Sequence, residues 1–89
     1  MDRADALRIL DEERRRAMEL IAQAGTLEAL ESARTSSLGR KAPFSQVQRA
    51  LGDMSDADRP AVGQAANETR AALEAALDER RVALEREAE

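Results

Sequence analysis

Hydrophobic residues recur at steps of three and four along most of this 89-residue chain, the spacing of one face of an α-helix. The first stripe consists of Leu7, Leu10, Ala17, Ile21 and Ala24, and Arg14 interrupts it. This stripe predicts a helix over residues 2–24. Gly25 and Thr26 follow. Because glycine commonly ends helices and threonine is a good N-cap, a second helix is predicted over residues 27–38.

The second half of the chain predicts a short helix and then a long one. Gly39 ends the preceding helix, and Pro43 suits the first turn of the next, where its missing N–H would have no helical partner. The apolar face of this short helix consists of Phe44, Val47, Leu51 and Met54. Residues 55–58 resemble a capping box, and Pro60 is tolerated only near a helix start, so the last helix is predicted over residues 56–88.

The lengths of these elements predict an all-α fold, a long antiparallel helical hairpin. Residues 2–38 would form the outgoing arm, broken near residues 25–26, and residues 56–88 would form the returning helix. Residues 39–54, a short helix with turns, would make the tip. We therefore expect a single coiled-coil arm domain over residues 1–89, with both termini at the end away from the tip.

The amino-acid composition excludes several classes of functional site. Alanine supplies 19 residues, half of the 43% hydrophobic fraction, and it buries little surface, which favours a thin helical assembly. The chain has no cysteine and no histidine, which excludes disulfides and zinc sites built on those residues. No nucleophile–base pair is evident, so we expect no catalytic residue, metal or cofactor in this domain. With neither a signal peptide nor an apolar run of roughly 20 residues, we expect a cytoplasmic protein without a membrane span.

Charge is segregated along the chain. The net charge is −4, yet residues 32–52 contain four basic residues and no acidic one. These four are Arg34, Arg40, Lys41 and Arg49. The remaining residues carry 10 basic and 18 acidic side chains. The other basic run, within residues 12–16, is surrounded by acidic residues and predicts ion pairs on a solvated helix face.

A set of short motifs resembles the N-terminal helical domain of bacterial phenylalanyl-tRNA synthetase alpha subunits, over about residues 20–89. The matching residues are Leu38, Gly39, Arg40, Lys41, Asp58, Arg59, Pro60, Gly63, Gln64, Asn67 and Glu68. Arg40 replaces a lysine of the family pattern, and Ala42 and Pro43 stand where its second glycine and a neighbour are expected. These two positions predict a stiffer backbone between the second and third helices.

The resemblance implies a coiled-coil arm that holds the elbow of tRNA(Phe) and performs no aminoacylation itself. It places catalysis, with ATP and Mg²⁺, in the rest of the full-length enzyme. It also implies a beta subunit as partner, in an (αβ)₂ heterotetramer. The isolated domain is expected to be a monomer.

The residues also suggest how such an arm would bind. Structured RNA is recognised mainly through its shape, phosphates and 2′-hydroxyls. Arg34, Arg40, Lys41 and Arg49 are candidate phosphate contacts, with Ser45, Gln46 and Gln48 as secondary hydrogen-bond donors. Phe44, the single aromatic residue, is assigned to a small core rather than to base stacking. If all four basic groups met phosphates, log affinity against log salt would have a slope no steeper than about −3 to −4.

One alternative stays open at this stage. The alanine-rich seam of the long helix could pair between chains, as in a protein-interaction or dimerisation coiled coil that does not bind RNA. Light scattering separates the two possibilities, since a monomer fits the hairpin arm and a concentration-dependent dimer fits the alternative.

Overall fold

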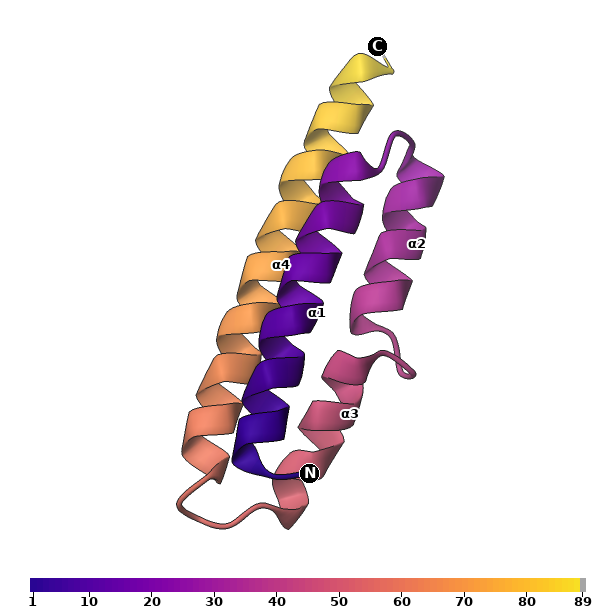
Figure 1. Cartoon of the computed structure of the whole chain (residues 1–89). Coiled ribbons are helices and arrows are strands. Elements are labelled where there is room, and N and C mark those ends of the chain that lie inside the picture. The colour runs from indigo at the N-terminus through magenta and orange to yellow at the C-terminus, as the bar shows by residue number, and fades with distance from the viewer. Residues whose placement is uncertain (89) are drawn as a thin grey trace.

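A computed structural model describes residues 1–88, in which helices are joined by short loops and turns (Figure 1). The elements are α1 (Arg3–Gln23), α2 (Leu27–Leu38), α3 (Pro43–Ala50), the 3-10 turn η1 (Leu51–Asp53) and α4 (Arg59–Glu87). No strand occurs within residues 1–88, so the predicted all-α class is confirmed. In this part of the chain no helix is long and apolar enough to cross a membrane.

The helices pack into a narrow bundle (Figure 1). In it α1 and α4 run in the same direction, while α2 and α3 follow one another in the opposite direction. At one end Arg3 lies 4.0 Å from Asp58, and at the other Arg80 donates to the Ala24 carbonyl over 2.9 Å. The α2–α3 leg and α4 therefore keep the antiparallel hairpin relationship. The prediction that residues 2–38 form a single outgoing arm is therefore wrong. The two termini were predicted to lie at the same end, but they lie at opposite ends of the bundle.

The chain reverses between α1 and α2 because each flanking helix end has its own capping interaction. The Thr26 hydroxyl accepts a hydrogen bond from the Ala29 N–H over 3.0 Å, which caps the start of α2. The bond from Arg80 on α4 satisfies the Ala24 carbonyl at the end of α1. Folding α2 back also buries the apolar stripes of α1, α2 and α4 against one another. A straight arm would leave part of them exposed.

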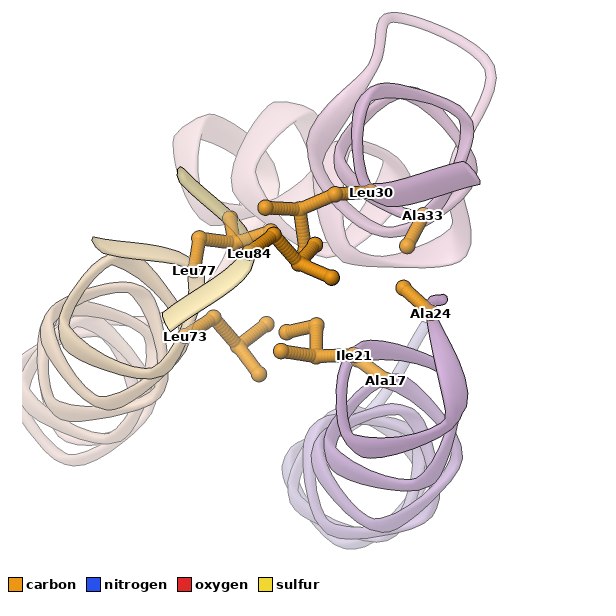
Figure 2. Close-up of a cluster of buried hydrophobic side chains, with 8 residues drawn as sticks. All are labelled: Ala17, Ile21, Ala24, Leu30, Ala33, Leu73, Leu77 and Leu84. Carbon is orange, nitrogen blue, oxygen red and sulfur yellow. The ribbon is translucent and has the colours of Figure 1, made fainter. Parts of the chain in front are cut away.

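The core divides into two clusters along the bundle. The first joins α1, α2 and α4, and its side chains converge in Figure 2. Its members are Ala17, Ile21, Ala24, Leu30, Ala33, Leu73, Leu77 and Leu84. The second joins α1, α3 and α4 and consists of Ala6, Leu10, Phe44, Val47, Met54, Val62 and Ala66. Phe44 is completely buried, as predicted, and the apolar seam of α4 packs within its own chain.

Two arginines attach α3 and η1 to α4. The guanidinium of Arg70 lies 5.1 Å from the centre of the Phe44 ring and donates to Gln48 Oε1 over 2.9 Å. Arg59 donates to the carbonyls of Leu51 (3.1 Å) and Met54 (2.8 Å). These bonds hold the connection between η1 and α4, and α4 begins at Arg59 because residues 55–58 form a separate turn.

Ser37 presents an unusual feature of the core, since its side chain is 1% exposed and its hydroxyl has no hydrogen-bond partner among residues 1–88. A buried unsatisfied polar group typically costs about 1–3 kcal/mol.

Ser37→Ala is therefore expected to raise the free energy of unfolding by about 1 kcal/mol, measured by urea denaturation. Ser32→Ala, on the exposed face of α2, is the matched control and should change stability by about 0.5 kcal/mol or less. Equal effects of the two substitutions would contradict the assignment.

Candidate nucleic-acid interface

The basic stretch centres on the loop of residues 39–42, which joins α2 to α3. This loop lies on the flank of the bundle beside α1, since Lys41 and Ala42 line the same depression as Glu13 and Arg16. The true end of the bundle is the connection from η1 to α4, which carries Asp53, Asp56 and Asp58. The expectation that positive charge collects at a tip over residues 39–54 is therefore corrected: it collects beside α1.

Gly39 sets the course of this loop. Its N–H donates to the Thr35 carbonyl over 2.9 Å and ends α2. A Cβ built on Gly39 would lie 2.4 Å from that carbonyl oxygen, so only glycine permits this close approach. Ala42 then takes an ordinary extended conformation and is buried, and Pro43 opens α3. A glycine is not needed at residue 42.

Three of the predicted donors hold the loop from within the protein. Each donates to the main-chain carbonyl of a different loop residue. The bonds are Ser45 Oγ to Gly39 O (2.7 Å), Arg49 Nη1 to Arg40 O (3.0 Å) and Gln46 Nε2 to Lys41 O (3.5 Å). The fourth side chain in this group, Gln48, accepts from Arg70. These side chains therefore support the loop that presents Arg40 and Lys41.

Arg40, Lys41 and Arg49 are the exposed cations of this surface, which we call the basic loop surface. None of the ion pairs found within residues 1–88 includes any of the three. Lys41 is also the single lysine among the 14 basic residues. The surface can therefore offer several N–H donors to an anion without first breaking an ion pair.

Arg34 stands apart from the basic loop surface. It faces α4, where its guanidinium forms a forked pair with the Glu74 carboxylate at 3.3 and 3.0 Å. Glu31 and Asp78 line the same groove. These acidic neighbours offset its charge. Arg34 is therefore the one predicted phosphate contact that lies outside the basic loop surface.

Sequence reasoning did not foresee the contribution of α1. Within the charged run, Arg16 pairs with Glu13 at 2.8 Å, as the solvated-face interpretation predicted. Arg16 also reaches α2, donating to the Ser36 carbonyl (3.1 Å) and hydroxyl (3.0 Å). The hydrogen bond to Glu13 raises the pKa of Arg16. Because Arg16 and Ser36 lie 20 positions apart in the sequence, no local sequence pattern predicts this contact.

The arrangement of the exposed cations suits contact with a polyanion. Within residues 1–88 no group of three or more carboxylate, histidine or cysteine side chains could hold a metal ion. The depressions on this part of the molecule are shallow and open at the surface. An exposed, braced set of cations can instead contact a string of phosphates.

Comparison with known proteins places this chain among synthetase domains. Residues 25–89 match the family described as aminoacyl tRNA synthetase class II, N-terminal domain. Similar curated proteins include the "Phenylalanine--tRNA ligase alpha subunit" of Geobacillus thermodenitrificans, 43% identical over 54 residues. The protein of the same name from Thermosynechococcus vestitus is 36% identical over 63 residues.

These matches cover most of the chain and a small part of the relatives. The alignments span 61% of this chain and 16% of the Geobacillus protein, and 71% and 19% for Thermosynechococcus. The family match begins after the last residue of α1. The basic loop surface therefore lies inside the matched region, while Glu13 and Arg16 lie outside it.

Proposed function

Because the chain belongs to the family of aminoacyl-tRNA synthetase class II N-terminal domains, as its motifs predicted, we propose that it is the tRNA-binding arm of a phenylalanine–tRNA ligase alpha subunit. In this proposal the basic loop surface contacts the backbone of tRNA(Phe) at its elbow. Binding positions the tRNA, and the residues of this domain perform no chemistry.

The observation that carries this proposal is a braced loop with three exposed cations outside any described ion pair, on a chain of net charge −4. Acidic side chains dominate elsewhere and would repel phosphates, which concentrates phosphate contacts on the loop. Guanidinium and ammonium groups bind phosphate oxygens whatever the base sequence. Because Phe44 is buried beneath Arg70, stacking on a base is not available to it.

The remaining steps belong to the full-length enzyme in this proposal. Aminoacylation with ATP and Mg²⁺ would occur in another part of the alpha subunit. A beta subunit would complete an (αβ)₂ heterotetramer, and the enzyme would act in the cytoplasm. The isolated domain is expected to be a monomer in light scattering, because its apolar seam is already packed within the chain.

Charge reversal at the centre of the surface tests the RNA assignment. Arg40→Glu combined with Lys41→Glu should weaken binding to a folded tRNA(Phe) transcript by about tenfold or more, because each change removes a charge-assisted hydrogen bond. With three phosphate contacts the wild-type slope of log affinity against log salt should be about −2 to −3, and the double variant should be flatter by about 2. Fluorescence anisotropy at several salt concentrations measures both.

A matched control makes the same change of charge near the C-terminal end of α4. Arg81→Glu combined with Arg86→Glu should leave tRNA affinity within about threefold of wild type, since these residues lie far from the loop. Both variants should keep the wild-type circular dichroism spectrum. Equal losses in the two double variants would show that only net charge matters and would overturn the assignment to this surface.

A further inference from the structure

A shallow depression of about 320 Å³ adjoins the basic loop surface, between α1 and the turn from α2 to α3. Its lining brings together a carboxylate, a guanidinium, two hydroxyls and an ammonium group, with Ala42 and Pro43 as an apolar wall. The polar residues are Glu13, Arg16, Thr35, Ser36 and Lys41. This mixture differs from the purely cationic surface beside it.

Glu13 is the residue that the phosphate-binding hypothesis does not explain. Its side chain is 13% exposed, and Arg16 holds both carboxylate oxygens, with Nη2 at 2.8 Å from Oε1 and Nε at 3.0 Å from Oε2. Each carboxylate oxygen has two lone pairs, so each can accept one more hydrogen bond. A fixed negative charge in the same depression as Lys41 would repel a phosphate. It would attract a hydroxyl donor.

We propose that this depression is a ribose subsite in which Glu13 accepts a hydrogen bond from a 2′-hydroxyl of the bound RNA. The proposal rests on the proposed function, because the neighbouring phosphate would be held by Lys41. Ala42 and Pro43 would pack against the sugar. Since the 2′-hydroxyl is the group that distinguishes RNA from DNA, Glu13 makes the domain selective for RNA.

The other partners in the depression support a sugar hydroxyl over a second phosphate. The guanidinium of Arg16 is already used by Glu13 and by the Ser36 carbonyl and hydroxyl. The depression therefore has one ammonium group for a phosphate and one well-oriented carboxylate for a donor. A nucleotide presents both groups within a single sugar–phosphate unit.

The test compares two ligands of one sequence: a tRNA(Phe), and the same molecule with fluorine in place of each 2′-hydroxyl. Fluorine removes the donor. Wild-type protein should bind the hydroxyl form about five- to tenfold more tightly. Glu13→Ala should reduce this ratio by about fivefold, and Glu13→Gln, which keeps an acceptor and the bond to Arg16, should reduce it less. Glu12→Ala, one residue away and exposed, changes the net charge equally and should leave the ratio unchanged.

The ratio separates specificity from a purely structural role of Glu13 in holding Arg16. Loosening of α2, or removal of a negative charge, would change the affinity for both ligands by the same factor. Equal wild-type binding of the two forms overturns the ribose subsite and leaves the proposed function standing. A wild-type preference that survives in Glu13→Ala also overturns the subsite, because the hydroxyl is then read elsewhere. Absence of binding to either form overturns the proposed function and the subsite together.

Discussion

Replacing Phe44 by alanine is expected to lower the free energy of unfolding by about 3–5 kcal/mol, the usual cost of removing a buried aromatic ring. Phe44 is completely buried in the second core cluster, where it joins α3 to α1 and α4. The substitution also removes the ring beneath Arg70. A domain of this length has a total stability of about 5–13 kcal/mol, so the loss is a large part of it. Urea denaturation followed by circular dichroism measures the change.

Two further variants show whether the effect comes from this ring. Leu27→Ala removes a large side chain that is 47% exposed and should cost about 1 kcal/mol or less. Phe44→Leu fills most of the space and loses the contact with Arg70, so its cost should fall between the other two. If Phe44→Ala costs no more than Leu27→Ala, the second cluster does not hold α3 in place.

The helix boundaries could be predicted from the sequence because their signals are local. Thr26 caps α2, Gly39 ends it and Pro43 opens α3, each at the position where the sequence placed it. The start of α4 was displaced from residue 56 to Arg59 because Ser55 forms a turn of its own with the N–H groups of Asp58 and Arg59. Local hydrogen bonding thus decides where an element begins and ends.

The direction of α1 could not be predicted in the same way. Gly25 and Thr26 fit a slight break and a complete reversal equally well, since both need a helix end followed by an N-cap. The reversal is stabilised by residues distant in sequence, such as Arg80 at the Ala24 carbonyl and Leu30 in the same buried cluster as Ile21. The sequence held one hint of this reversal: Arg80 lies in the apolar seam of α4, and an arginine is a suitable partner for the carbonyl groups at the C-terminal end of another helix.

The sequence predicted which cations form the candidate site, but it did not predict the tertiary contacts that these and neighbouring residues make. Segregated charge located Arg40, Lys41 and Arg49, and the structure keeps them exposed and close together. The pairing of Arg34 with Glu74, 40 residues away, has no local signal. The same holds for Glu13 and Lys41, which line one depression because the tertiary fold brings α1 to the loop.

Substitution of Gly39 by alanine should affect stability and RNA binding together. The added Cβ would lie 2.4 Å from the Thr35 carbonyl oxygen, a main-chain atom that cannot move without disturbing the end of α2. Forcing such a contact typically costs about 1–3 kcal/mol. The same shift displaces the Gly39 carbonyl that Ser45 holds, so the loop presenting Arg40 and Lys41 loses its support. Thermal melts and tRNA anisotropy should both show the loss.

Gly63 provides the control, because the same substitution there is expected to have the opposite sign. It lies inside α4, and a Cβ built on it meets nothing within 4 Å. Gly63→Ala should therefore raise stability by about 0.5–1 kcal/mol through helix propensity and a less flexible unfolded chain. Its tRNA affinity should match the wild type. If Gly39→Ala also proves neutral or stabilising, the loop tolerates a side chain at this position, and close approach to Thr35 is not what shapes the basic loop surface.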